Sequence, residues 1–221
     1  MSIDPSAIVH KSAKVHKDAI IKASAVIGKH VEIGAGTVVD SHAVITGPTK
    51  IGKNNHIYSF ASIGGDPQDI TYEDGQESNL VIGDDNLIRE FCTINRGTEK
   101  ENSLTRIGSN NMLMSYVHIA HDCQLGNHII MSNNASLAGH VRIADWAILG
   151  GFVLVKQFCN VGRHTYAGMG SHINKDIPDY MVASGVQPKI RSINTVGLKR
   201  RGFSASSIAS IKRAFKVVYR E

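Results

Sequence analysis

The sequence is poor in the residues that stabilise small secreted domains and in long apolar runs. It has three cysteines, Cys92, Cys123 and Cys159, an odd number without zinc-like spacing, which argues against a disulfide framework. No apolar run reaches the roughly 18 residues of a membrane-spanning helix, and Met1 to Ser6 lack the pattern of a secretory signal. Hydrophobic residues make up 42% of the chain and charged residues 19%, a composition that excludes intrinsic disorder. We therefore expect a folded cytoplasmic protein without an integral membrane segment.

Most of the chain also lacks a net positive charge. The formal net charge is +5, yet residues 186–221 contain nine basic residues and one acidic residue and so carry +8. The other residues together carry −3. One basic segment on a mildly acidic protein predicts docking to an acidic partner and argues against general nucleic-acid binding.

What the sequence does have is an aliphatic residue at every sixth position. This spacing is neither the 3.6 of a helix nor the 2 of a long strand, and it is typical of short strands separated by regular turns. The pattern resembles the hexapeptide-repeat family of left-handed β-helices, which implies three faces and three hexads per coil, with each aliphatic buried between coils. The series is Val9, Val15, Ile21, Ile27, Ile33, Val39, Ile45, Ile51, Ile57 and Ile63, then Ile82, Ile88 and Ile94, then Ile107, Leu113, Ile119, Leu125, Met131, Leu137, Ile143, Leu149, Val155 and Val161.

The expected fold is thus all-β, a left-handed parallel β-helix over residues 1–186 with seven to eight coils. The frame slips twice, at about 65–79 and at 95–104, where polar segments predict projecting loops with a functional role. Residues 187–221 form the predicted C-terminal segment with a basic α-helix. Ser204 is its expected N-cap, and the apolar stripe contains Ile208, Ile211, Phe215 and Val218.

If one coil contains three hexads, residues three hexads apart in the sequence lie in one column along the outside of the prism. His121, Gly139 and Gln157 recur at intervals of three hexads, and so do Asp122 and His140. A histidine can accept a proton from a hydroxyl, and a glycine lets a carbonyl oxygen approach its backbone N–H. The column therefore predicts an acyl-transfer site with His121 as general base, in which a carboxylate would fix the imidazole tautomer.

Two other interpretations of these histidines remain open at this point. Any one of them, His118 included, could be a solvated residue on a solenoid face. Three histidines on a left-handed β-helix also resemble the trimeric γ-class carbonic anhydrases, in which zinc is shared between subunits. The surrounding segments do not resemble that family, so we predict no metal.

Longer motifs resemble one enzyme family throughout most of the chain. The matching strings are YSFASIG (58–64), PQD (67–69), INRGT (94–98), HIAHDC (118–123), NNASLAGHV (133–141), QFC (157–159) and GLKRRGFS (197–204). Together these strings resemble the acyl-[acyl-carrier-protein]:UDP-N-acetylglucosamine O-acyltransferases, which begin lipid A synthesis.

This resemblance implies roles for particular residues. His121 would activate the 3-hydroxyl of the sugar for attack on the thioester of a 3-hydroxyacyl chain, with Asp69 as the orienting carboxylate and the Gly139 N–H on the oxyanion. Lys199 and Arg200 would meet the acidic acyl carrier protein. The active unit would be a homotrimer with sites between solenoids, and no cofactor is implied beyond the carrier's phosphopantetheine. The implied contacts to sugar nucleotide or pantetheine are Gln68, His118, Asp122, His140, Gln157, Asn194 and Arg201.

The chain departs from the family pattern at a few positions. Thr71 and Lys156 stand where a lysine and a histidine are usual, and Val196 stands where an acid is common. Met169 replaces a glycine of members that accept long chains, which predicts a shorter 3-hydroxyacyl chain. Because Thr71 lies in the sugar-binding loop, an N-acyltransferase acting on a 3-amino UDP-sugar is an alternative.

Two further alternatives are the N-acyltransferase that acts later in the same pathway and a non-catalytic scaffold. The later enzyme usually has a globular region before its coils, whereas the coils here begin by Val9. A scaffold would keep the hexads but would have no reason to keep His121 in register with Gly139.

Overall fold

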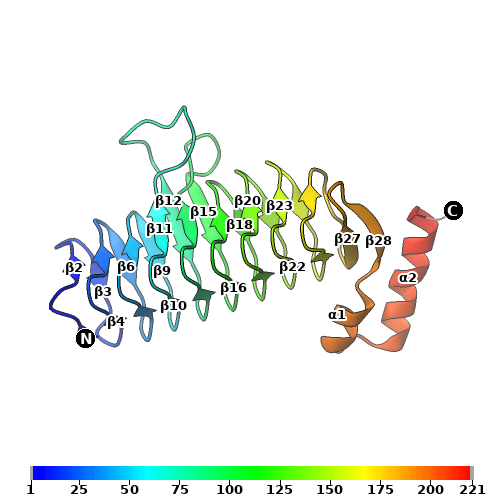
Figure 1. Cartoon of the computed structure of the whole chain (residues 1–221), viewed down its shortest axis with the longest axis horizontal. Helices are drawn as coiled ribbons and strands as arrows, with labels where there is room; N and C mark the ends of the chain where they lie inside the picture. Colours follow the sequence, from blue (N-terminus) through cyan, green and yellow to red (C-terminus); the bar gives the residue numbers. More distant parts are fainter. Residues whose placement is uncertain (1, 220–221) are drawn as a thin grey trace.

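The computed structural model describes residues 2–219, which form an elongated three-sided prism with two helices at its C-terminal end (Figure 1). The chain passes from sheet A to sheet B to sheet C in every coil. Sheet A contains β1 (Ser2–Ile3), β4 (Ile20–Ile21), β7 (Val38–Val39), β10 (His56–Ile57), β13 (Leu87–Ile88), β16 (Met112–Leu113), β19 (Ile130–Met131), β22 (Ile148–Leu149), β25 (Tyr166–Ala167), β27 (Met181–Ser184) and β28 (Lys189–Ile193). Sheet B contains β2 (Ile8–Val9), β5 (Val26–Ile27), β8 (Val44–Ile45), β11 (Ser62–Gly65), β14 (Thr93–Asn95), β17 (His118–Ile119), β20 (Ser136–Leu137), β23 (Leu154–Val155) and β26 (His172–Ile173). Sheet C contains β3 (Lys14–Val15), β6 (Val31–Ile33), β9 (Thr49–Ile51), β12 (Asn79–Ile82), β15 (Leu104–Ile107), β18 (Gln124–Leu125), β21 (Arg142–Ile143) and β24 (Asn160–Val161).

The strand register confirms the parallel β-helix and its coil length. Parallel partners are three hexads apart in regular coils, as in the pair Ile119 and Leu137. The separation grows where a loop is inserted, as in the pair Ile57 and Ile88, which span the first loop. Each inserted loop thus leaves the coil and returns to the same register.

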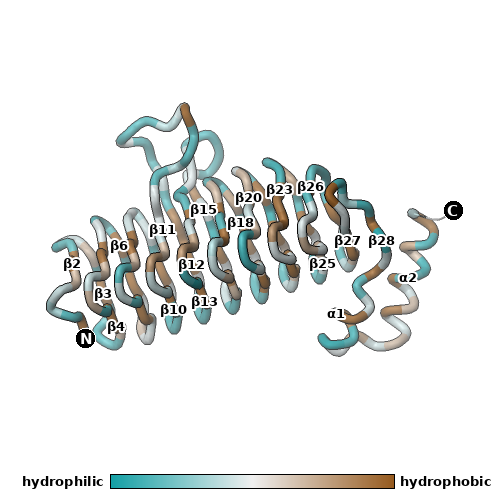
Figure 2. Tube along the Cα trace, in the orientation of Figure 1, coloured by the Kyte–Doolittle hydropathy of each residue, from teal (hydrophilic) through white to brown (hydrophobic). Residues whose placement is uncertain are grey.

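The hexad aliphatics form the core. From Ile21 to Val161 every member of the series is buried, and the hydropathy colours alternate along each coil (Figure 2). Burial of one such side chain contributes about 1.5–3 kcal/mol, so stacked coils stabilise one another. The three cysteines are buried and free, and burial raises the pKa of the Cys92 and Cys123 thiols to about 12. They are therefore core residues and not nucleophiles.

Each passage between sheets forms one of three edges, and a residue with positive φ recurs there once per coil. We call these edges A/B, B/C and C/A after the sheets that they join. Phe60 lies on edge A/B with φ 62°, Asp122 on edge B/C with φ 61°, and Trp146 on edge C/A with φ 64°. Successive corner side chains stack, as Phe60 does on Phe91 with ring centroids 5.3 Å apart. Side chains at equivalent corners of successive coils therefore meet on an edge.

The outer faces of the sheets differ in polarity. Sheet C presents charged side chains such as Lys14, Glu32 and Lys50, of which the first two form an ion pair. Sheet A presents apolar ones, namely Val38, Leu87, Met112, Ile130 and Ile148. A row of apolar residues on one face is typical of a protein–protein contact.

The C-terminal segment closes the prism. β28 pairs antiparallel with β27 and is followed by α1 (Thr195–Arg200) and α2 (Ala205–Tyr219). Ser204 Oγ accepts a hydrogen bond from Ser207 N, so the predicted N-cap is confirmed. Ile208 and Phe215 are buried as predicted, but Val218 is 69% exposed, and α1 was not predicted. Neither helix is long and apolar enough to cross a bilayer in the part of the chain described.

Candidate active site

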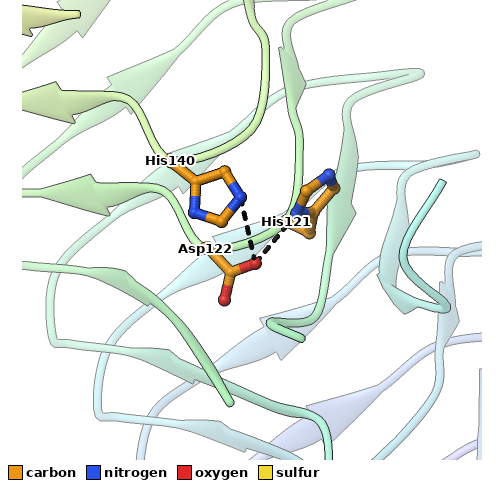
Figure 3. A group of neighbouring side chains, drawn as sticks. All are labelled: His121, Asp122 and His140. Atoms are coloured by element: carbon orange, nitrogen blue, oxygen red, sulfur yellow. Dashed lines mark hydrogen bonds and ion pairs between the residues drawn. The ribbon is translucent and has the colours of Figure 1, made fainter. Parts of the chain in front are cut away.

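A histidine and a carboxylate form a buried pair on edge B/C. His121 and Asp122 occupy the turn between β17 and β18, and His121 Nδ1 lies 2.8 Å from Asp122 Oδ2 (Figure 3). The two residues are 5% and 3% exposed. Burial acts to raise the pKa of Asp122, but hydrogen bonds from His121 and Thr98 outweigh it and hold that pKa below its usual range. An ionised Asp122 fixes the proton of His121 on Nδ1 and leaves Nε2 as the basic nitrogen.

The prediction that Asp69 orients His121 is corrected by this geometry. Asp69 Oδ2 accepts a hydrogen bond from Lys100 Nζ at 2.6 Å, and its Oδ1 accepts from Thr71. These bonds lower the pKa of Asp69, that from Lys100 most. The Nδ1 position of His121 is already occupied by Asp122, so Asp69 is an anchor of the first loop.

Gly139 lies directly against the His121 ring. A Cβ atom built on Gly139 would be 2.6 Å from His121 Cε1 and 2.8 Å from Nε2, so a side chain at this position would push the His121 ring aside. Within residues 2–219 the Gly139 N–H donates to no other protein group. The predicted register of His121 and Gly139 is therefore confirmed, and a backbone donor lies beside the basic nitrogen.

His140 completes the cluster from the next coil. Its ring is perpendicular to that of His121, with centroids 5.1 Å apart, and stacks on Phe158 at 4.5 Å. Its Nε2 lies 3.9 Å from Asp122 Oδ2, and its Nδ1 lies 3.5 Å from Glu101 Oε1. His140 Nδ1 is buried and makes no hydrogen bond among the described residues; Glu101 Oε1 is the acidic atom that faces it.

His118 lies on the outer face of sheet B, on the same coil. Its Nδ1 is 2.7 Å from Thr93 Oγ1. Burial, and to a lesser degree the neighbouring His121, lower the pKa of His118, so its ring is neutral near pH 7. Gln157 is exposed on edge B/C one coil beyond Gly139, where Phe158 N donates to Gly139 O.

Both predicted loops leave the prism at edge B/C. The first joins β11 to β12 and the second joins β14 to β15, and they protrude together from one side (Figure 1). The first loop carries Gln68, which is exposed, and Asp69. The loops therefore stand on the edge that carries the histidine cluster.

His121, Asp122 and His140 also meet the distance requirement for a metal site, since their ligand atoms lie within 4.8 Å of one another. The carboxylate of Asp122 is already occupied, however. Its Oδ2 accepts from Thr98 Oγ1 and His121 Nδ1, and its Oδ1 accepts from Thr98 N. Three hydrogen bonds on one carboxylate fit an acid–base pair better than a metal ligand.

Comparisons with known proteins agree with this interpretation. The chain is 52% identical over 218 residues to the acyl-[acyl-carrier-protein]–UDP-N-acetylglucosamine O-acyltransferase of Saccharophagus degradans, a match that covers 99% of this chain and 84% of that protein. It is 50% identical to the enzyme of the same name from Halorhodospira halophila, again over 99% and 84%. The chain belongs to this family. A family profile described as Udp N-acetylglucosamine O-acyltransferase, Domain 2, matches residues 176–221.

Solved structures of the family have the same fold. The UDP-N-acetylglucosamine acyltransferase of Francisella novicida superposes with a TM-score of 0.98 at 48% identity, covering 99% of this chain and 80% of that one. The enzyme from Acinetobacter baumannii gives 0.97 at 44% identity, over 99% and 84%. The amino-sugar, zinc and scaffold alternatives are not favoured by these relatives.

Several predicted residues of the family site lie elsewhere on this chain. Asn194 Oδ1 accepts from Gly197 N as the N-cap of α1, and its Nδ2 donates to His164 O on edge C/A. Arg201 lies on the same edge, with its guanidinium 5.1 Å from the ring centroid of Trp146. Met169 is 74% exposed on edge A/B. None of the three lies on the edge that carries His121.

Lys199 and Arg200 are exposed in the last turn of α1, as a docking role requires. A functional second loop was predicted, but its contacts with the histidine cluster were not. Thr98 binds both oxygens of Asp122, and Glu101 approaches His140. The string INRGT ends on Thr98 and was the available signal, but nothing in its spacing indicated which side chain it would meet.

Proposed function

We propose that this chain transfers a 3-hydroxyacyl group from acyl carrier protein to the 3-hydroxyl of UDP-N-acetylglucosamine, the first step of lipid A biosynthesis. The observation that carries the proposal is the buried His121–Asp122 pair against Gly139, whose N–H has no partner within residues 2–219. The proposal includes a cytoplasmic location and does not include nucleic-acid binding.

The proposed reaction uses three groups of the protein, namely His121, Gly139 and Asp122. His121 Nε2 accepts the proton of the sugar hydroxyl as the hydroxyl oxygen attacks the thioester carbonyl. The Gly139 N–H donates to the resulting oxyanion. As the C–S bond breaks, the imidazolium returns its proton to the departing pantetheine thiolate, so an O–H and a C–S bond are replaced by a C–O and an S–H bond. The balance requires no cofactor.

Asp122 contributes by holding the imidazole in one tautomer and by stabilising the imidazolium, as the carboxylate of a Ser–His–Asp triad does. We assign Gln68, His118, His140 and Gln157 to substrate contacts, because they lie on edge B/C or beside it. His140 Nδ1 is buried and makes no hydrogen bond within residues 2–219, although Glu101 Oε1 lies 3.5 Å away, so we assign it to contact with a substrate oxygen.

A homotrimer is the second part of the proposal. Asn194 and Arg201 lie on edge C/A and Met169 lies on edge A/B, so they could reach a His121 site only on a neighbouring solenoid. The apolar outer face of sheet A supports such a contact, whereas the charged face of sheet C suits solvent.

The carrier is proposed to dock at the C-terminal end. Lys199 and Arg200 are exposed there, in the segment that holds most of the excess positive charge. Charge complementarity of this kind increases the association rate and is weakened by salt.

One assay tests donor and acceptor together. The purified protein is incubated with UDP-N-acetylglucosamine or its 3-amino analogue and with a panel of hydroxyacyl carriers. We expect turnover of the hydroxyl sugar, dependent on His121. Turnover of the amine alone would replace the proposal by the N-acyltransferase alternative, and no turnover with any pair would refute it.

A further inference from the structure

The second loop holds the carboxylate of the catalytic pair through Thr98. Thr98 N donates to Asp122 Oδ1 at 2.9 Å, and Thr98 Oγ1 donates to Asp122 Oδ2 at 2.7 Å. Thr98 is 2% exposed, so water does not compete for these bonds. One residue thus binds both carboxylate oxygens and prevents the carboxylate from rotating.

The base of the loop is itself fixed, which gives Thr98 a defined position. Gly97 N donates to Asn79 O at 3.0 Å, and Ser103 N donates to Thr98 O at 3.0 Å. The buried guanidinium of Arg96 binds Gly64 O and the Asp66 carboxylate at the base of the first loop. The second loop is therefore anchored to the prism immediately before Thr98.

The backbone of Asp122 is held as well. Asp122 N donates to Thr105 Oγ1 at 2.8 Å, and Thr105 is fully buried in β15. The main chain and both carboxylate oxygens are thus fixed by threonines on two neighbouring segments. Oδ2 is shared between the hydroxyl of Thr98 and Nδ1 of His121.

We infer that Thr98 is a positioning residue for the catalytic pair, in which its hydroxyl and N–H keep the Asp122 carboxylate aimed at His121 Nδ1. Thr98 acts through Asp122 and touches no reacting atom. The inference rests on the proposed function only in taking His121 as the base. Without the hydroxyl, Oδ2 has one donor fewer, so the Asp122 carboxylate binds a proton more tightly.

The other ionisable groups around Asp122 are few. His121 belongs to its own turn, His140 faces it from the next coil, Glu101 of the second loop lies on the far side of His140, and His118 lies in the preceding strand. A change in the titration of His121 after substitution of Thr98 alone therefore reports the lost hydroxyl, because none of these groups is altered.

The test compares Thr98→Val, which has the same shape without the hydroxyl, with Thr98→Ser, which keeps it. For Thr98→Val we expect kcat to fall about 10-fold to 100-fold, as for loss of a hydrogen bond to a charged group, with the KM for the UDP-sugar unchanged. The acidic limb of the kcat profile and the NMR titration of His121 should both move to higher pH. Thr98→Ser should restore both.

Thr37→Val is the matched control, because Thr37 is fully buried and its hydroxyl binds Gly52 O in a coil away from the site. It should lower stability without moving either readout. Should Thr98→Val not fold, Thr98→Ala removes the same hydroxyl. Equal losses in the valine and serine variants, or an unchanged His121 titration, would overturn the inference. The titration needs no substrate, so it remains decisive even if the proposed acyl transfer is absent.

Discussion

The ring of His121 packs against the main chain of Gly139, with no room for even a methyl group between them. The contact arises because the two residues occupy equivalent corners of successive coils, about 4.8 Å apart along the prism. The proposed base and the proposed oxyanion donor are thereby held together by the strand register of β17 and β20.

Replacing Gly139 by alanine should abolish most activity. A Cβ atom would displace the His121 ring, so we expect kcat to fall by about 10² or more, as for a catalytic group moved by about 1 Å. Gly151→Ala is the control, because its Cβ would meet Asn133 O at an ordinary 3.4 Å. Steady-state kinetics and thermal melts of both variants make the comparison. Full activity of Gly139→Ala would remove this glycine from the mechanism.

His121→Ala should reduce kcat by about 10² to 10⁴, the usual contribution of a general base. Asp122→Asn should cause a loss of similar order, because an amide cannot stabilise the imidazolium. Since the two act as a unit, the double variant should be little worse than the worse single one. Additive losses in kcat would show that the pair does not act together.

Asp122 should also make stability depend on pH. Because its pKa is lowered on folding, its ionised form stabilises the native state above the unfolded pKa, and this contribution is lost as the pH falls below about 4. The difference in free energy of unfolding between wild type and Asp122→Asn should shrink over that range. Urea titrations of both proteins at pH 7 and pH 3.5 measure this difference in free energy of unfolding. A difference independent of pH would contradict the lowered pKa of Asp122.

Met169→Gly should shift the preferred donor toward longer acyl chains, because it removes a bulky exposed side chain from edge A/B. The variant is assayed against carriers loaded with 3-hydroxyacyl chains of increasing length. Met114→Leu, a conservative change elsewhere on the prism, is the control. An unaltered optimum would rule out a role of Met169 in chain selection.

Ile130→Asp should dissociate the proposed trimer, since it places a charge on the apolar face of sheet A. Arg142→Asp, a charge change on the exposed face of sheet C, should leave it assembled. Sedimentation velocity distinguishes the species, and activity should be lost with the trimer. A trimeric Ile130→Asp protein would exclude this face from the contact.

The coils could be predicted from the sequence because one period fixes which side chains face inward and which meet across coils. The same period places Gly139 against His121. It does not predict that Asp122 pairs with His121, because neighbours in an extended strand point in opposite directions. The strand already ends at Ile119, and His121 and Asp122 lie in the turn that follows, where Asp122 has a φ of 61°.

The six-residue period could not predict the contacts inside the loops or the helix α1. The position of Asp69 depends on Lys100 in the other loop, and no spacing rule relates the two. The helix α1 has six residues, too few to show a helical repeat, and it is specified by the cap at Asn194.

The inserted loops leave and rejoin the coil without disturbing it, so insertions are harmless to the core when they return to the same corner. Removing one hexad between His121 and Gly139 would be different. Every aliphatic would still point inward, but all later residues would advance by one face, and Gly139 would emerge on a neighbouring edge. Such a protein would fold but would be inactive, although it would differ from the native chain only by one six-residue repeat.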